Sequence, residues 1–323
     1  MMLRSDDMLD ALRAAGEPTR LRILVLLAAE ELSVMELGRI LDQSQPRVSR
    51  HLKLMSEAGL IERFPDGAWV FYRLPSAGSR RALVDAILDR LDLTEDQSER
   101  DLARLAEIQA ERLASAAAYF EQVAPRWDDI RSHYVAEDAV EAAIVRVAGE
   151  GPFRRLIDLG TGSGRMLTLL GTRARSALGL DLSQQMLNVA RARAREAGLD
   201  SIELRHGDIF STREPDASAD LVLVHQVLHY LNDPASAVAE AARLTAPGGR
   251  LLLVDFAPHA LEQLREQHQH RRLGFSDEEI SRWLADAGLS LEQNVALPPS
   301  REPGLTVKIW AAVRSRDHLR SVA

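Results

Sequence analysis

The second half of the chain alternates short apolar runs with segments of helical periodicity. Five of these runs are predicted as strands, at residues 156–159, 177–181, 202–209, 220–224 and 251–254. Because strands separated by helix-length segments are typical of βαβ units, the repeat predicts an open parallel sheet. Such sheets bind ligands at the carboxyl ends of their strands, so the residues that follow each run form the candidate site.

The first 75 or so residues show a different pattern, in which helices are followed by one hairpin. Met8, Leu9, Leu12 and Ala15 are predicted to form one apolar helix face that ends at Gly16. The further predicted helices run from Pro18 to Ala28, from a capping box at Ser33–Glu36 to Leu41, and from Ser44 to Gly59. Strands 60–64 and 69–74 then flank a turn at Pro65-Asp66-Gly67-Ala68. This order of elements outlines a winged helix-turn-helix, mostly α-helical with a β-wing.

Three glycines follow the first strand of the predicted sheet. Gly160, Gly162 and Gly164 lie between Asp158 and a predicted helix, where glycine lets the backbone adopt positive φ and approach a ligand. A dinucleotide-binding loop requires Gly or Ala three residues after its second glycine. This chain has Arg165 at that position, so the spacing does not fit a dinucleotide-binding loop. The glycine loop alone is weak evidence for a ligand site. The next two predicted strands, however, both end in acidic residues. Asp181 is predicted to accept the ribose hydroxyls of a nucleoside, and a Gly-Asp pair ends the third strand.

This acidic-x-G-x-G-x-G spacing resembles motif I of the class I S-adenosylmethionine (SAM) methyltransferases. The resemblance implies a Rossmann-like, seven-stranded sheet closed by an antiparallel hairpin, with Leu305–Val313 as its final strand after a capped helix at Phe275–Gly288. It also implies that SAM, or S-adenosylhomocysteine (SAH) as a ligand, is bound, with Asp208 and Ile209 at the adenine. The residues expected to contact the cofactor are Asp158, Gly160, Thr161, Gly162, Gly164, Asp181, Leu182, Met186, Gly207, Asp208, Ile209 and His225.

Catalytic residues cannot be assigned from the sequence. SAM is an activated donor, so a base is needed only where the acceptor is a hydroxyl, a thiol or a protonated amine. We expect His225 to contact the cofactor through its backbone, and His229 to be a helix residue. For His268 and His270 a surface position is expected, with entry of one of the two into the pocket as the alternative. The chain lacks cysteine, which excludes disulfides, thiolate metal sites and the thiol chemistry of arsenite methyltransferases.

The N-terminal segments Glu17–Leu24, Glu31–Leu37 and Val48–Leu52 resemble the ArsR/SmtB family of bacterial repressors. That resemblance covers about the first quarter of the chain. It implies a homodimer, with the N-terminal helix and the helix after the wing, about 80–91, at the interface. Metal-sensing members carry cysteines in the second segment, where this chain has Ser33 and Met35. A metal site is therefore not expected.

The helix that begins after Ser44 is the candidate for the major groove of double-stranded operator DNA. From Gln43 to Ser56 its only ionised side chains are cationic. Cations contact phosphates, and Gln or Arg side chains read base edges. The predicted DNA-binding residues are Ser44, Gln45, Arg47, Ser49, Arg50 and Lys53.

The length and composition of the chain predict its domain organisation and its location. With 323 residues, the chain is predicted to hold a DNA-binding and dimerisation domain at 1–92, a helical linker or lid at 93–150 with Tyr119, Trp127 and Tyr134 on the substrate side, and a SAM-binding domain at 151–316. No apolar run is long enough for a membrane span, and no secretory signal is apparent, so a cytoplasmic location is expected. The net charge of −8 argues against broad nonspecific binding to nucleic acid.

Three functions are compatible with this arrangement. The first is a transcriptional regulator whose methyltransferase domain senses SAM or SAH. The second is an active small-molecule methyltransferase that also regulates its own operon. The third is an enzyme whose helix-turn-helix serves only for dimerisation. The acceptor, the operator sequence and the direction of regulation are not encoded in any pattern of the sequence.

Overall fold

The structure is a computed structural model that describes residues 3–66, 69–75, 77–124, 137–199, 202–299 and 304–316. The chain divides into two compact units, residues 1–114 and 115–323, and each is described by itself. Within the described residues, no helix is both long and apolar enough to span a membrane.

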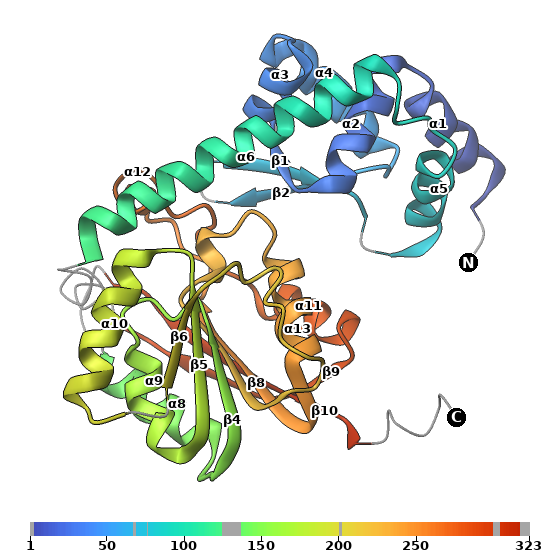
Figure 1. Ribbon diagram of the computed structural model, residues 1–323. Coiled ribbons are helices and arrows are strands. Elements are labelled where there is room, and N and C mark those ends of the chain that lie inside the picture. The colour runs from blue at the N-terminus through green and yellow to red at the C-terminus, as the bar shows by residue number, and fades with distance from the viewer. Residues whose placement is uncertain are drawn as a thin grey trace. The chain divides into compact units, whose positions relative to one another are not determined.

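The N-terminal unit is a helical bundle with a small three-stranded sheet (Figure 1). Its elements are α1 (Ser5–Ala15), α2 (Pro18–Ala29), β1 (Leu32–Ser33), α3 (Val34–Leu41), α4 (Gln45–Glu57), β2 (Glu62–Asp66), β3 (Trp69–Arg73), α5 (Gly78–Leu88) and the first part of α6 (Asp96–Val123). The predicted capping box is present, because Ser33 accepts from the backbone of Glu36 and the Glu36 side chain accepts from the backbone of Ser33. The winged helix-turn-helix expected from the sequence is confirmed.

Three local predictions for this unit need correction. Helix α1 buries Ala11, Ala14 and Ala15, whereas Leu9 and Leu12 remain 49% and 48% exposed, because the small alanines allow α1 to pack closely. The hairpin turn is shorter than expected, since Pro65 and Asp66 pair with β3 as part of β2. Proline is tolerated there because β2 is an edge strand. The two-residue strand β1, which pairs with β3, had no signal in the sequence.

Helix α6 packs into the core of the N-terminal unit by apolar contacts and by buried ion pairs. Leu105 and Ile108 join the same apolar cluster as α2, α3 and α4. Arg22 on α2 donates to both oxygens of Asp101, at 2.5 and 2.8 Å, and the Asp101 side chain is 3% exposed. Farther along, Arg112 pairs with Glu30 at 2.9 Å and also contacts Glu36. This part of the predicted linker is therefore integral to the N-terminal core.

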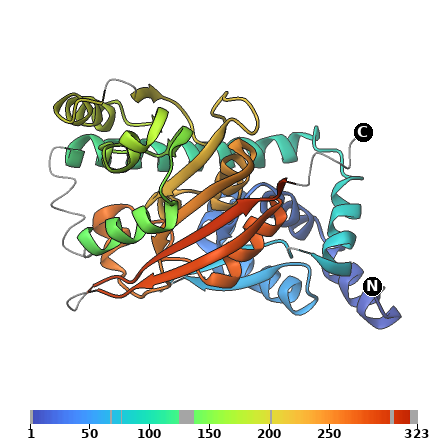
Figure 2. The ribbon, with the colours of Figure 1, turned by 90° about the horizontal axis from the view of Figure 1, so that it is seen from below.

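The C-terminal unit is built on a seven-stranded sheet. Its elements are α8 (Glu137–Ala148), β4 (Phe153–Leu159), α9 (Arg165–Leu170), η2 (Gly171–Arg173), β5 (Ala174–Asp181), α10 (Gln184–Glu196), β6 (Ile202–His206), β7 (Ala219–His225), η3 (Leu228–Tyr230), α11 (Pro234–Leu244), β8 (Thr245–Phe256), α12 (Gln263–His268), α13 (Asp277–Asp286), β9 (Leu289–Leu297) and β10 (Val307–Arg314). The strand order is β6-β5-β4-β7-β8-β10-β9. The first five strands in that order are parallel, and the antiparallel hairpin β9–β10 completes the sheet (Figure 2). The predicted fold class is thereby confirmed.

Helices cover both faces of this sheet, and alternate residues of the central strands point to opposite faces. Leu156 packs in one apolar cluster with residues of α8 and α9, while Ile157 packs in another with residues of α11 and α13. Figure 1 shows α8 and α9 on one side of the strands and α11 and α13 on the other. Both faces are buried, which explains why the central strands read as nearly continuous apolar runs.

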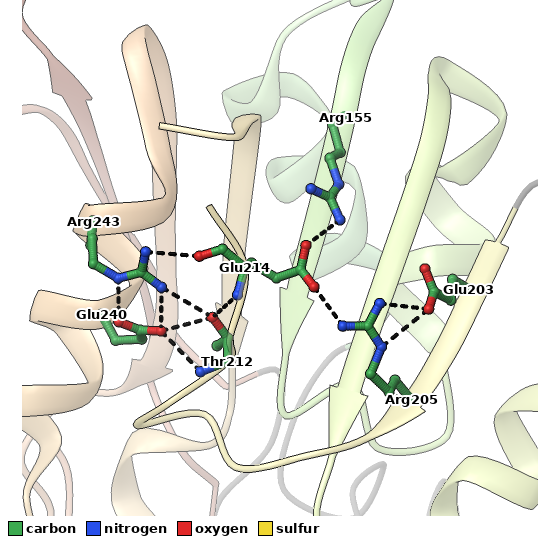
Figure 3. Close-up of polar contacts among 7 residues, drawn as sticks. All are labelled: Arg155, Glu203, Arg205, Thr212, Glu214, Glu240 and Arg243. Atoms are coloured by element: carbon green, nitrogen blue, oxygen red, sulfur yellow. Dashed lines mark hydrogen bonds and ion pairs between the residues drawn. The ribbon is translucent and has the colours of Figure 1, made fainter. Parts of the chain in front are cut away.

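The segment that follows β6 is held in place by ion pairs rather than by a helix (Figure 3). Glu214, only 8% exposed, accepts one hydrogen bond at 2.5 Å from Arg155 on β4 and another at 2.5 Å from Arg205 on β6. Burial would raise the pKa of Glu214, but these two arginines outweigh it and lower that pKa. Arg243 on α11 donates to the Glu214 carbonyl at 2.8 Å. The network anchors the segment that carries Asp208 and Ile209.

Candidate functional site

The glycine loop after β4 forms a tight turn against the neighbouring strand. The backbone N–H groups of Gly160 and Thr161 both donate to the Leu180 carbonyl at 2.9 Å. All three glycines have positive φ, between 53° and 75°, as the sequence predicted. A Cβ on Gly160 would lie 2.4 Å from Cγ2 of Val227, and one on Gly164 would lie 2.9 Å from Cβ of Ala190. At these two positions glycine is therefore also required by the protein's own packing.

Asp158 is buried at the base of this loop. Its side chain is 1% exposed, and Oδ2 accepts a hydrogen bond from Thr161 Oγ1 at 2.6 Å. Among the described residues, Oδ1 has no hydrogen-bond partner. Burial raises the pKa of Asp158 to about 7; the Thr161 hydrogen bond opposes this rise and the nearby Asp181 adds to it. An unpartnered buried carboxylate oxygen is suited to a ligand that carries a positive charge or an N–H donor.

Asp181 ends β5 and holds the glycine loop. Its Oδ2 accepts from the Gly162 N–H at 2.8 Å and its Oδ1 from the Ser183 N–H at 2.8 Å. Burial raises the pKa of Asp181, although these backbone donors oppose the rise. The two neighbouring predicted residues differ in exposure, since Leu182 is 47% exposed and Met186 only 2%. Each oxygen of Asp181 retains a lone pair with which it can accept a ligand hydroxyl.

The third acid belongs to the adjacent strand end. Gly207 donates its N–H to the Asp181 carbonyl at 3.1 Å, which places the end of β6 beside that of β5. Asp208 is exposed and accepts from the Phe210 N–H at 3.0 Å, whereas Ile209 is 5% exposed. His225, half-buried, ends β7 on the other side of β4. The structure thus brings the predicted cofactor residues to the carboxyl ends of four adjacent strands, in the order β6, β5, β4 and β7.

Helix α4 presents the predicted DNA-binding residues on one face. Val48, Leu52 and Met55 are fully buried, and the opposite face is exposed. Ser44 occupies the N-cap position without a side-chain cap bond. Lys53 lies 3.8 Å from Glu57, but no carboxylate of the described residues forms an ion pair with Arg47 or Arg50. The exposed face comprises Ser44, Gln45, Arg47, Ser49, Arg50 and Lys53.

A buried aspartate and histidine form a pair that was not predicted. His229 Nδ1 lies 2.7 Å from Asp255 Oδ1, and the two side chains are 1% and 0% exposed. His229 belongs to the short 3-10 helix η3, and Asp255 lies near the end of β8. They are 26 residues apart in the sequence, so periodicity could not have paired them. An aspartate near the end of an apolar strand was the only available signal.

The expectation of surface positions for His268 and His270 is wrong for His270, which is 7% exposed. The backbone turns at Gln269, with φ of 58°, and folds His270 back against the ring of His229. His268 is half-buried and bonds to the Tyr119 hydroxyl through Nδ1 at 2.6 Å. Trp127 and Tyr134 lie outside the described residues.

Comparison with known families matches one segment in each of the two units. Residues 17–63 match the family described as "Bacterial regulatory protein, arsR family". Residues 157–253 match "Methyltransferase domain". The chain joins an ArsR-family domain to a methyltransferase domain. The first match contains α3 and α4, and the second contains the glycine loop and the strand ends with Asp181, Asp208 and His225.

Relatives of the methyltransferase domain include named enzymes. The chain is 32% identical over 136 residues to a ubiquinone biosynthesis O-methyltransferase of Paracidovorax citrulli, a match that covers 41% of this chain and 57% of that protein. It is 32% identical over 180 residues to the 27-O-demethylrifamycin SV methyltransferase of Amycolatopsis mediterranei, covering 51% and 65%. In both cases the chain spans less than two thirds of the relative's length.

Among solved structures, a chain from the Haloferax volcanii complex of the Trm112 methyltransferase activator with a methyltransferase has the same fold. Its TM-score is 0.50 at 23% identity, and the match covers 61% of this chain and 97% of that chain. At this identity the similarity concerns the fold of the methyltransferase domain alone.

Proposed function

We propose that this protein is an ArsR-type, DNA-binding transcriptional regulator whose methyltransferase domain binds SAM or SAH, and that this binding changes operator affinity. The observation that carries the proposal is α4, whose inner face is apolar and buried while its outer face is basic and exposed. A recognition helix requires such a division, because base edges and phosphates must be reached from one face.

The residues of the glycine loop suit this cofactor. Asp158 Oδ1 is an orphaned buried acceptor, and SAM carries both an amino group and a sulfonium charge. Asp181 ends β5, Asp208 lies two residues after the end of β6, and they would hold the ribose and the adenine. When bound, SAM supplies an activated methyl group. The chain's own task is to hold the nucleoside against the strand ends and to exclude water.

The effect of SAM or SAH binding on operator affinity is tested by titration of the protein against operator DNA. Duplexes that bind the full-length protein are first selected from random DNA, and their affinity is then measured without ligand, with SAM and with SAH. We expect at least one of the two ligands to change the dissociation constant by about 5- to 150-fold, which corresponds to a coupling free energy of about 1–3 kcal/mol. Superimposable curves in all three conditions would refute the regulatory coupling.

Arg50→Ala is expected to weaken binding to a selected operator by about 1–3 kcal/mol, because it removes a cation that has no carboxylate partner on the exposed face of α4. Fluorescence anisotropy at constant salt measures the change. Arg195→Ala, which removes an exposed arginine of α10, is the matched control and leaves operator affinity unchanged. Equal affinities of Arg50→Ala and wild type would contradict the assignment of α4.

Ligand binding is expected to tighten as pH rises through 7. In the free protein, the pKa of Asp158 is raised to about 7, so at pH 6 most molecules hold a protonated carboxyl that cannot pair with a cationic ligand. Because the apparent dissociation constant scales inversely with the ionised fraction, SAM should bind about tenfold more weakly at pH 6 than at pH 8. Calorimetry across this range measures the effect, with Asp158→Asn as the variant.

The Asp158→Asn variant should bind SAM more weakly, and its affinity should lack this pH dependence. Titration of the ligand itself is common to both proteins and cancels in the comparison. The raised pKa also means that wild-type stability falls as pH rises from the ordinary aspartate range towards 7, since the buried carboxyl must ionise. The variant has no carboxyl group at this position, so its stability does not fall in this way. It should therefore be at least as stable as wild type at pH 8. Identical pH profiles of the two proteins would contradict the role of Asp158.

Homodimerisation is part of the proposal. Leu9 and Leu12 are 49% and 48% exposed, and because they lie three residues apart on α1 they are neighbours on its surface, where they could pack against a second copy of the chain. Light scattering of the full chain at several concentrations measures the stoichiometry. A monomer at all concentrations would contradict this part.

A second candidate function is methyl transfer to a small molecule, in the cytoplasm, by the same domain. The observation that favours it is the buried pair His229–Asp255, because an oriented imidazole beside a nucleotide-binding loop is the type of group that removes a proton from an acceptor. Turnover of labelled SAM tests it.

A further inference from the structure

The His229–Asp255 pair has a fixed orientation. Asp255 Oδ1 lies 2.7 Å from His229 Nδ1 and also accepts the Phe256 N–H at 2.8 Å. A carboxylate at this distance favours the tautomer in which Nδ1 carries the proton, and Nε2 is then left with its lone pair. The arrangement of a histidine held by a buried aspartate is the one that prepares an imidazole for general base catalysis.

Among the residues that the structure describes, His229 Nε2 has no hydrogen-bond partner. It is a buried atom in a side chain that is 1% exposed. Leaving a buried imidazole nitrogen without a hydrogen bond destabilises the folded protein by about 1–3 kcal/mol. The open lone pair of Nε2 is therefore suited to a hydrogen-bond donor from a bound molecule. Among the described residues, no group of three or more metal-ligating side chains is found.

The surroundings of His229 are aromatic. Its ring centroid lies 4.1 Å from that of Tyr230, 5.0 Å from that of Phe256 and 4.2 Å from that of His270. His270 Nδ1 is a second buried nitrogen without a hydrogen bond among the described residues, and burial lowers the pKa of His270, which favours its neutral form. Planar rings with two unpartnered nitrogens are suited to a planar ligand that carries polar substituents.

Backbone contacts fix this cluster beside the glycine loop. The His229 carbonyl accepts the N–H groups of Arg271 and Arg272 at 2.8 and 3.1 Å, which holds the segment with His270 over η3. Two residues before His229, Val227 packs so closely on Gly160 that a Cβ there would clash. The imidazole therefore belongs to the segment that packs directly on the glycine loop.

We propose that His229 is the proton acceptor for a phenol-type hydroxyl of an aromatic methyl acceptor, and that Asp255 is its positioning residue. The inference rests on the proposed methyltransferase activity. His229 Nε2 takes the hydroxyl proton, and the oxygen lone pair forms the new O–C bond to the methyl group of SAM. The C–S bond breaks with its electron pair remaining on sulfur, which yields the methyl ether and SAH. The imidazolium, stabilised by Asp255, then releases its proton to water.

The test uses 4-nitrocatechol, whose absorbance changes when its hydroxyl ionises, with the full-length protein and saturating SAH. At a pH where the free probe stays protonated, we expect wild type to produce the absorbance of the ionised probe. His229→Asn keeps an amide donor for Asp255 but lacks a basic nitrogen. It should reduce this signal at least about tenfold. Asp255→Asn should reduce the signal in the same way, because the amide no longer holds the Nδ1–H tautomer.

Calorimetry of SAH separates this inference from the proposed function. We expect SAH to bind both variants and the control Gln267→Ala, an exposed residue of α12, within about twofold of wild type. Turnover of 4-nitrocatechol with labelled SAM should fall about 100-fold or more in His229→Asn, and remain unchanged in the control. Failure of wild type to bind SAM or SAH would refute the proposed function. SAH binding with no probe ionisation, or with equal ionisation in wild type and His229→Asn, would overturn the role of His229.

Discussion

Asp101→Ala is expected to lower the free energy of unfolding of the N-terminal unit by about 3–5 kcal/mol. The Asp101 side chain is 3% exposed and accepts two hydrogen bonds from Arg22, at 2.5 and 2.8 Å, and one from Gln97 at 3.0 Å. Removing the carboxylate leaves the Arg22 guanidinium, 20% exposed, without its counter-charge. The cost is large because the remaining charge is partly desolvated, and not because the pair was strong in itself.

Amide hydrogen exchange of the full chain measures this loss. Protection of the amides of α2 and α6 should fall by at least about 100-fold in Asp101→Ala. The matched control is Glu111→Ala, a substitution on the same helix as Asp101. It breaks the ion pair of Glu111 with Arg39 of α3, whose side chains are 60% and 58% exposed. An exposed pair contributes about 0–1 kcal/mol, so the control should change little. Similar losses in both variants would contradict the importance of burial.

Gly160→Ala is expected to disrupt the glycine loop and to cost about 2–5 kcal/mol. Two effects add, because the residue has φ of 71° and because the new Cβ would lie 2.4 Å from Val227 Cγ2. A left-handed backbone costs an ordinary residue about 1–2 kcal/mol, and overpacking costs about 1–3 kcal/mol. The variant should bind SAH more weakly and unfold at a lower temperature, as calorimetry of both processes measures.

Two controls separate these effects. Gly198 has φ of 65°, and a Cβ there would meet nothing within 4 Å, so Gly198→Ala measures the backbone effect alone. Val227→Ala combined with Gly160→Ala relieves the clash and should recover part of the loss, in a double-mutant cycle. If Gly160→Ala lost no more stability than Gly198→Ala, the close contact with Val227 would not contribute to the effect.

Local signals in the sequence were reliable where one short segment determines the structure. The capping box at Ser33, the capped helix that begins after Ser276 and the glycine loop were predicted correctly, because each depends on residues close together in the chain. The seven-stranded sheet was predicted by the resemblance to a known family, supported by the repeat of apolar runs.

Features that depend on contacts distant in sequence were not predictable. The ion pair of Arg22 with Asp101 joins residues 79 apart, and charged residues on a helix look like a solvated surface until their partners are known. His229 and Asp255 meet only because β7 and β8 are neighbours in the sheet. The α1 face was predicted wrongly because its alanines pack closely, whereas hydrophobicity alone favoured its leucines.

The packing of α6 determines where the chain can be shortened. A DNA-binding fragment that stops at residue 92 would lack Leu105 and Ile108, and it would leave Arg22 and Glu30 without Asp101 and Arg112. Such a truncation would expose apolar surface and aggregate. Fragments intended for crystallisation or for isolated binding studies should therefore extend to residue 114, where the first compact unit ends.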